Sequence, residues 1–315
     1  MHRSRGSRCR RDLALHVTFL FNYHEGLLPS PPVSTADQRK KLLGMLLRVG
    51  VFALIAALGY YFVFPLIIAF LGAPVLVIST LGTFAAAAVA NTLALRIYER
   101  GSLSDIGLGW TAASRRNLSL GMLGGIGAAL AVIVLPLLLR MADFEPVPNE
   151  RLRWPSLLFV SILLLFGAVG EEMLFRGYGF QVLVKGMGPF ATILPVAVLF
   201  GLAHSQNLNF GPLALFNTIL WGVVLGYAYL RSGDLWLPIG LHFGWNWSLP
   251  LLGANLSGFT MDVTGYAMHW KIGGLLSGGA YGPEGGLLTT AVAIGLFFYV
   301  GKAPIQHQEA IQEEA

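Results

Sequence analysis

Charged residues and cysteine are both scarce in this sequence. Only 12% of its 315 residues are Asp, Glu, Lys or Arg, whereas soluble domains carry about 25%. A water-facing globular domain is therefore excluded. Disorder is excluded as well, because 55% of the residues are hydrophobic and 20 of them are Phe. Cys9 is the single cysteine, so the chain can form neither an internal disulfide framework nor a thiolate metal cluster.

The few charged residues are separated by long uncharged stretches. No Asp, Glu, Lys or Arg occurs over the 45 residues from Gly186 to Leu230, which is room for two membrane spans. The pattern predicts an all-α fold, a polytopic bundle of about eight transmembrane helices in the lipid bilayer, with an intramembrane polar cavity. The expected spans are residues 49–70, 75–95, 118–139, 155–178, 189–204, 210–230, 235–254 and 287–301.

Three segments follow from this pattern. Residues 1–41 form a basic N-terminal arm that we expect to be flexible, residues 42–302 form the transmembrane domain, and residues 303–315 form a short cytosolic tail. The apolar stretch of the arm is short, is interrupted by His16 and lacks a small-residue cleavage site after it, which argues against a cleaved signal peptide. Whether the arm belongs to the mature protein or reflects a start codon placed too far upstream stays open.

The net charge of +5 does not indicate nucleic-acid binding. Its basic residues lie in the arm and between apolar blocks, where Lys and Arg orient a membrane protein with the positive side in the cytosol. With a cytosolic N-terminus, sixteen Lys and Arg fall on the inner side and four on the outer side, with Arg48 left aside at the edge of the first span. We therefore predict that both termini are cytosolic and that the protein lies in a bacterial inner membrane. The inner residues are eight in the arm together with Arg96, Arg100, Arg115, Arg116, Arg176, Lys185, Arg231 and Lys302, and the outer ones are Arg140, Arg151, Arg153 and Lys271.

Three polar clusters interrupt the expected spans. An ionisable group in a span costs about 2.5–3.5 kcal/mol on insertion scales, so each such cluster is a candidate functional site. At 1.5 Å per helical residue, the clusters lie at similar depths, ~21 Å, ~22 Å and ~12–18 Å from the nearest cytosolic span end. We therefore expect them to meet inside the bundle. The clusters are Glu171, Glu172 and Arg176; Phe200 and His204; and His242 and Asn246.

The spacing within each cluster indicates how the side chains are used. Glu172 and Arg176 are four residues apart, so on a helix they face each other and can form an ion pair. Glu171 is rotated by about 100° from Glu172 and points elsewhere. His242 and Asn246 are also four residues apart and project from one helix face. A carboxylate with imidazoles in a dry cavity suits general acid–base catalysis, and an amide suits oxyanion stabilisation.

The order Glu-Glu-x-x-x-Arg, Phe-x-x-x-His and His-x-x-x-Asn on separate membrane helices resembles the CPBP family. This family, also called Abi, contains CAAX prenyl endopeptidases and bacteriocin-processing or bacteriocin-immunity proteins. The resemblance covers about residues 118–301 and is most specific between Ala168 and Asn246. It implies an eight-helix intramembrane endopeptidase that hydrolyses a peptide bond in a protein or peptide substrate, with lipid-modified substrates included.

The resemblance also assigns roles to the motif residues. Glu171 and His204 would activate the attacking water, while His242 and Asn246 would hold the tetrahedral oxyanion. The Glu172–Arg176 pair would support the site by holding the helix and tuning Glu171.

Members of this family are often labelled metalloproteases, and the chain leaves two mechanisms open. It has no His-Glu-x-x-His motif, because His24-Glu25 is followed by Gly-Leu-Leu. Glu171, His204 and His242 could still ligate a divalent metal such as zinc with a position open for water. We favour a glutamate-type mechanism without a metal cofactor.

A non-catalytic membrane protein is the alternative function. The clusters could belong to a proton-coupled transporter or to an immunity-type scaffold that has lost activity. Transporters often show paired inverted halves with broken helices, whereas here all three clusters fall between Gly170 and Asn246. The complete motif argues against a degenerate scaffold, so the sequence favours the endopeptidase.

Two glycine-rich stretches have structural interpretations. Residues 121–127 have no preceding strand and no suitably spaced acidic residue, so close helix packing explains them better than a nucleotide-binding loop. The predicted outer loop, residues 255–286, is long and rich in Gly. The sequence alone does not show whether it covers the mouth of the bundle.

Overall fold

A computed structural model describes residues 34–308, except 64–65, 68–69, 71 and 149–150. The chain divides into two compact units, residues 1–42 and 43–315. In the first unit the described residues include the start of helix α2, Thr35–Leu58, so the last residues of the expected arm are helical. The expectation of flexibility for residues 1–33 lies outside the described part of the chain.

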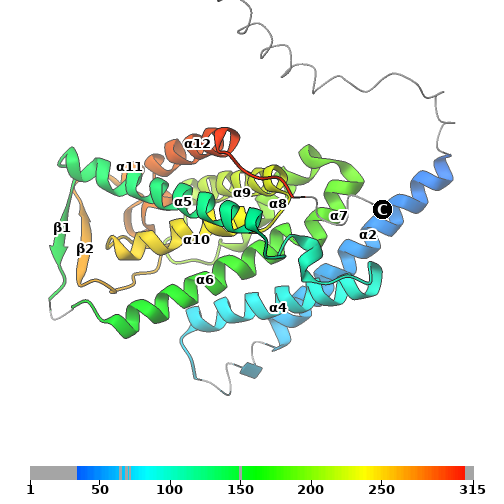
Figure 1. The fold of residues 1–315 in the computed structure, drawn as a ribbon. Coiled ribbons are helices and arrows are strands. Elements are labelled where there is room, and N and C mark those ends of the chain that lie inside the picture. Colours follow the sequence, from blue (N-terminus) through cyan, green and yellow to red (C-terminus); the bar gives the residue numbers. More distant parts are fainter. Residues whose placement is uncertain (1–33, 64–65, 68–69, 71, 149–150, 309–315) are drawn as a thin grey trace, which may run out of the picture. The chain divides into compact units, whose positions relative to one another are not determined.

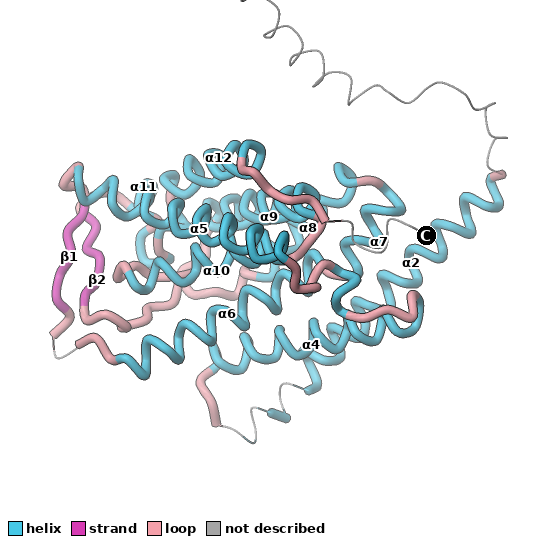
Figure 2. Tube along the Cα trace, in the orientation of Figure 1, coloured by secondary structure: helices cyan, strands magenta, loops and turns pink. Residues whose placement is uncertain are grey.

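Helices make up most of the second unit, as the sequence predicted (Figures 1 and 2). A π-helical segment, η1 (Gly59–Val63), continues α2, and short 3-10 turns occur at Leu103–Ile106, Gly279–Tyr281 and Pro283–Gly285. The remaining helices are α4 (Val75–Tyr98), α5 (Ala112–Leu138), α6 (Trp154–Arg176), α7 (Tyr178–Met187), α8 (Pro189–Ala203), α9 (Pro212–Ser232), α10 (Trp236–Leu251), α11 (Gly274–Ser277) and α12 (Leu287–Lys302).

Several of these helices have the length and composition of membrane spans. Among the described residues, five are long and apolar enough to cross a membrane, and two more are apolar but shorter. The all-α membrane bundle is therefore confirmed, whereas the number of eight spans stays a prediction. The five are Thr35–Val63, Val75–Tyr98, Ala112–Leu138, Trp154–Met187 and Pro212–Ser232, and the shorter two are Pro189–Ala203 and Leu287–Lys302.

A small sheet was not expected from the sequence. Strands β1 (Ala142–Pro146) and β2 (Tyr266–Trp270) pair antiparallel, with Ala142 opposite Trp270. β1 follows α5, and β2 lies in the predicted outer loop, so the pairing ties this loop to the α5–α6 connection. Each strand has only five residues and one buried position, which leaves no alternating apolar pattern for a sequence to display.

A helix break at Gly177 separates α6 from α7. The depth estimate for Glu171 assumed one continuous helix to Lys185, so that assumption was wrong. A side chain at Gly177 would overlap the carbonyl oxygen of Met173 and the amide oxygen of Asn91. The Asn91 side chain satisfies the backbone groups freed by the break, because its amide donates to Met173 O (2.9 Å) and its oxygen accepts from Tyr178 N (2.8 Å).

Glycines on two helices set the position of α10, which carries His242 and Asn246. A Cβ at Gly121 or Gly125 of α5 would overlap backbone atoms of α10, and a Cβ at Gly240 or Gly244 of α10 would overlap backbone atoms of α5. Small residues of this kind let two membrane helices approach closely. The structural interpretation of the glycine-rich stretch 121–127 therefore agrees with the observed packing.

Residues 303–308 close one end of the bundle. Gln308 donates its backbone N–H to Ser232 O (2.7 Å), and Asn117 binds both the backbone N–H and the carbonyl of Gln306. The Asp234 carboxylate accepts hydrogen bonds from the side chains of Asn117 and Gln308. Burial nevertheless raises the pKa of Asp234 above its ordinary value. Part of the expected tail is thus fixed against the ends of α5, α9 and α10.

Candidate active site

Helix α6 contributes a buried ion pair. The side chains of Glu172 and Arg176 are 0% and 1% exposed, and Arg176 Nη1 lies 3.1 Å from Glu172 Oε1. Arg176 Nη2 also donates to Gly222 O on α9 (2.9 Å), and its guanidinium carbon lies 4.7 Å from the ring centre of Phe200. The structure therefore contains the ion pair that the i, i+4 spacing predicted. It joins α6 to α8 and α9.

The Glu172 carboxylate also orients His242. His242 Nδ1 lies 2.8 Å from Glu172 Oε1, the oxygen that also binds Arg176. A carboxylate only accepts, so this contact places a proton on Nδ1. The other ring nitrogen, Nε2, faces Glu171 Oε2 at 3.8 Å.

The second histidine is oriented from its own helix. His204 follows α8 directly, and its Nδ1 lies 2.8 Å from Phe200 O. Because a carbonyl only accepts, Nδ1 carries the proton and donates. His204 Nε2 then faces Glu171 Oε2 at 3.6 Å. The backbone carbonyl one helical turn before His204 thus fixes the ring.

Glu171 thus lies between two imidazoles from different helices. Its Oε2 atom is buried and has no hydrogen-bond partner among the described residues. Separations of 3.6 and 3.8 Å are too long for direct hydrogen bonds, and polar groups at this separation are commonly bridged by a water molecule. The structure therefore brings together the clusters that the sequence placed at similar depth.

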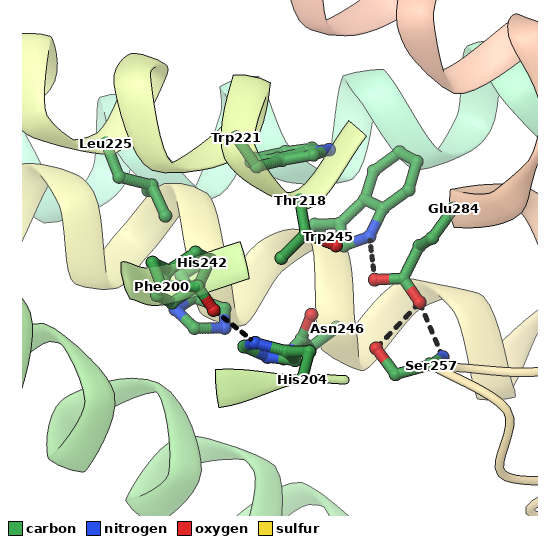
Figure 3. A pocket seen from close by; sticks show the side chains of 10 residues that line it. All are labelled: Phe200, His204, Thr218, Trp221, Leu225, His242, Trp245, Asn246, Ser257 and Glu284. Carbon is green, nitrogen blue, oxygen red and sulfur yellow. Dashed lines mark hydrogen bonds between the residues drawn. The ribbon is translucent and has the colours of Figure 1, made fainter. Parts of the chain in front are cut away.

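A small cavity lies beside the two histidines (Figure 3). Its volume is about 30 Å³, counted as space for the centres of water molecules; one water needs about 10–15 Å³ on this measure. Asn246, half-buried and one turn beyond His242, is part of the wall. The lining residues are Phe200, His204, Thr218, Trp221, Leu225, His242, Trp245, Asn246, Ser257 and Glu284.

Two residues of this wall, Ser257 and Glu284, were missed by the sequence analysis. Both come from the segment between α10 and α12. The Glu284 carboxylate accepts hydrogen bonds from the backbone and hydroxyl of Ser257 and from Trp245 Nε1 (3.2 Å), as Figure 3 shows. Glu284 is one of two acidic residues in the Gly-rich outer loop, with Asp262, and its presence there did not indicate that the loop folds back onto α10.

The donor set has the chemistry of a zinc site but not its arrangement. Histidines that bind zinc usually donate their second N–H to a carbonyl or carboxylate, as His204 and His242 do. However, no group of three or more His, Cys, Asp or Glu side chains that could hold a metal ion occurs in the described residues. Metal ligation by Glu171, His204 and His242 stays a prediction.

The two oriented imidazoles line a water-sized cavity in an apolar helix bundle, and the Glu171 carboxylate lies next to both imidazoles without lining the cavity itself. Such a set of groups is suited to hydrolysis. Residues 153–248, which carry every motif residue, match the family described as "Type II CAAX prenyl endopeptidase Rce1-like". This match confirms the resemblance to the CAAX endopeptidases and implies a protease at family level.

One curated relative is also similar, the "Uncharacterized 24.3 kDa protein" of Escherichia coli. It is 31% identical over 148 residues, which are 45% of this chain and 62% of that protein. The chain therefore spans about three fifths of the length of this relative. No solved structure matches the chain.

Proposed function

We propose that this protein is an intramembrane endopeptidase of the CAAX type, which uses water activated by Glu171 to hydrolyse a peptide bond. The observation that carries the proposal is the position of Glu171 Oε2, which faces His204 Nε2 at 3.6 Å and His242 Nε2 at 3.8 Å. A carboxylate within reach of a bound water can act as a general base, and the same group can later return the proton.

The first step of the proposed mechanism is attack by water. Glu171 removes a proton from the water, and the Nε2 lone pair of His204 accepts the second water hydrogen and orients the oxygen. The oxygen forms a bond to the scissile carbonyl carbon, and the carbonyl electrons move onto oxygen. Glu171 then gives its proton to the leaving nitrogen as the C–N bond breaks, which releases a carboxylic acid and an amine.

The developing oxyanion needs donors on the other side of the carbonyl. Asn246 supplies an amide N–H from the cavity wall. His242 supplies a second N–H when its imidazole is doubly protonated, with Nδ1–H bound to Glu172. Arg176 stabilises Glu172, so the pair acts on the reaction by positioning His242.

The substrate in this proposal is a protein or peptide at the lipid bilayer, and a lipid-modified peptide is one candidate. We also propose that the protein lies in a bacterial inner membrane with both termini in the cytosol. The non-catalytic alternatives, a scaffold and a proton-coupled transporter, are outcomes of the following test.

The test compares purified, detergent-solubilised wild type with Glu171→Gln. Glu145→Gln is the matched control, because Glu145 lies on β1 with its side chain 61% exposed. A fluorogenic prenylated peptide and a library of membrane peptides serve as substrates, with and without a chelator. We expect Glu171→Gln to remain folded and to lose cleavage, while Glu145→Gln retains it.

Each other outcome has a defined meaning. Equal cleavage by wild type and Glu171→Gln would refute the role of Glu171. Loss of wild-type cleavage on chelation would replace the glutamate-type mechanism with the metal-dependent one. Absence of cleavage by folded wild type across the whole library would favour the non-catalytic alternatives.

A further inference from the structure

Glu284 is a third carboxylate at the candidate site, and it comes from outside the region that matches the family. It lies in the segment 252–286 between α10 and α12, whereas the match covers residues 153–248. Its side chain lines the same cavity as His204 and Asn246. The proposed hydrolysis gives Glu284 no role, so its place in the cavity wall calls for another explanation.

Contacts from two other segments fix the backbone of Glu284. The buried side chain of Asn217 on α9 donates to the carbonyls of Glu284 (2.8 Å) and Gly286 (2.9 Å). Gly282 has a φ of 102°, and a Cβ there would overlap the carbonyl oxygen of Asn255, so this position needs glycine. The position of the carboxylate in the cavity wall is therefore set by the fold.

Ser257 adopts a conformation that directs two donors to this carboxylate. Its φ of 51° lies in the left-handed region, which is uncommon for residues other than glycine. Its backbone N–H and its hydroxyl both donate to Glu284 Oε2, and Trp245 Nε1 donates to Oε1. Such conformations persist where the surrounding structure imposes them, and they are frequent at ligand-binding sites. All three partners donate, as they do to an ionised carboxylate.

The charge of Glu284 is not neutralised in the described part of the chain. Its three donors are neutral, and no Lys, Arg or His forms an ion pair with it there. A carboxylate has about four acceptor positions, so one stays free. With Glu171 and Glu172 it makes three carboxylates, against the guanidinium of Arg176. Even with His242 doubly protonated, these groups keep a negative charge that favours a cationic ligand.

The cavity has an apolar end and an acidic end. Phe200 and Leu225 line one end, as Figure 3 shows. Glu284 lines the other end, and His204 lies between the two. The volume of about 30 Å³ is room for about two water-sized groups. One is the attacking water of the proposed mechanism, and the second position fits the compact ammonium of a lysine.

We infer that Glu284 is a specificity-determining residue, which selects a peptide with a lysine side chain close to the scissile bond. The ammonium donates to the free acceptor position of the carboxylate, and an apolar neighbour in the peptide packs on Phe200 and Leu225. An acidic side chain at the lysine position is repelled. Selective cleavage rests on the proposed function, whereas selective binding needs no catalysis.

The test compares peptides that differ at a single position. Blocked apolar peptides carry lysine, norleucine or glutamate at one position, which is scanned along the peptide. Norleucine keeps the length of the lysine stem and removes the charge. Binding is measured first, on the detergent-solubilised Glu171→Gln protein, so that no cleavage occurs. We expect the lysine peptide to bind about 10–100-fold more tightly than the norleucine peptide at the selected position, the range of a hydrogen bond to a charged group.

Three variants in the Glu171→Gln background separate charge from packing. Glu284→Gln keeps the size of the side chain, and we expect it to bind the lysine and norleucine peptides about equally. Ser257→Ala removes one donor and leaves the carboxylate, so the preference for lysine should remain even where the segment 252–286 is loosened. Glu145→Gln is the control for surface charge, because its side chain is 61% exposed, and it should retain the full preference.

The outcomes that contradict the inference are distinct from those that contradict the proposed function. Equal affinity for the three peptides, or binding of none of them, would overturn the inference. A lysine preference that Glu284→Gln leaves unchanged would also overturn it, because the ammonium then binds elsewhere. Equal kcat/KM of wild type for lysine and norleucine peptides would do the same and leave the endopeptidase function intact. Lysine-selective binding that depends on Glu284, without cleavage by wild type, would support the inference and count against the proposed function.

Discussion

Asn246 is the residue whose proposed role can be measured most directly. Its side chain lines the cavity beside His242, and loss of one oxyanion donor usually lowers kcat by about 10²–10³-fold. We therefore expect Asn246→Ala to lower kcat by about that factor with little change in KM. Steady-state kinetics on a cleaved peptide will show this.

Ser248→Ala is the control for this measurement. Ser248 lies on the same helix, and its hydroxyl bonds within that helix to Gly244 O (2.7 Å). We expect a small change in kcat from this variant. An Asn246→Ala enzyme that differed from wild type only in the amount of folded protein would contradict the oxyanion role.

At this scale the sequence singled out the motif residues, which the structure brings close together; their catalytic roles stay predictions. Glu171, Glu172 and Arg176 stand out because they end an uncharged stretch, and burial of charge in a membrane is costly. The atoms that orient His204 could be foreseen only in part. Its partner is a backbone carbonyl, which every residue carries, so only the Phe-x-x-x-His spacing points to it.

At the scale of the element, the close contact between α5 and α10 sets the position of the helix that carries His242 and Asn246. Gly125 faces α10, and a Cβ there would overlap the carbonyl oxygen of Leu241 and crowd Trp245 N. We expect Gly125→Ala to push α10 outward, to lower thermal stability in detergent and to reduce cleavage. Gly127→Ala is the matched control, because nothing lies within 4 Å of a Cβ at that position.

We expect the substitutions Gly125→Ala and Gly127→Ala to have opposite effects on stability. Gly127→Ala should keep activity and slightly raise stability, since Ala is favoured over Gly in a helix by about 1 kcal/mol. Equal effects of the two substitutions, measured by thermal unfolding and by cleavage rate, would show that close packing of α5 on α10 does not matter for the site.

The segment 252–286 depends on Glu284 for its place over the cavity. Glu284→Gln keeps the size of the side chain but replaces one accepting oxygen with a donor, so it cannot accept from both Ser257 and Trp245 as the carboxylate does. We expect a looser segment and a rise in KM, with a smaller change in kcat. Steady-state kinetics will measure KM, and limited proteolysis will measure the loosening of the segment. Unchanged KM together with unchanged protease resistance would refute the role of Glu284 in holding the segment.

The elements also show where sequence reasoning stops. For most spans the expected ends lie within a few residues of the observed helix ends, because the length of the apolar stretch defines them. The break at Gly177 was missed, since its compensation comes from Asn91, a distant residue in another helix. The β1–β2 pair and the position of Glu284 were missed for the same reason: each depends on contacts between segments far apart in the chain.

At the scale of the whole molecule, Asp234 makes the thermal stability depend on pH. It lies at the end of the bundle that residues 303–308 contact. Burial raises the pKa of Asp234, so the folded protein holds this proton more tightly than the unfolded chain. The associated stability is present below the ordinary aspartate pKa, about 3.9, and is lost as pH rises through the raised pKa of the folded state. We expect the thermal midpoint to fall over this range, and the Asp234→Asn variant to lack this fall.

The measurement is thermal unfolding of the purified protein in detergent at a series of pH values. Asp105→Asn is a suitable control, because its hydrogen bonds lie in the solvent-exposed capping box of a short 3-10 turn. A wild-type pH profile identical to that of Asp234→Asn would contradict the assignment to Asp234.

One oxygen atom, Glu172 Oε1, receives both Arg176 and His242. The same acceptor therefore serves the buried ion pair, which joins the helices, and the orientation of His242. A substitution at Glu172 that alters one of them also disturbs the other. A substitution at Glu171 or His204 can remove the proposed activity and leave the fold intact, because neither residue belongs to the buried Glu172–Arg176 pair. Descendants that became mere scaffolds should consequently keep Glu172 and Arg176 after the neighbouring glutamate has gone, so the surviving pair alone is no proof of a working enzyme.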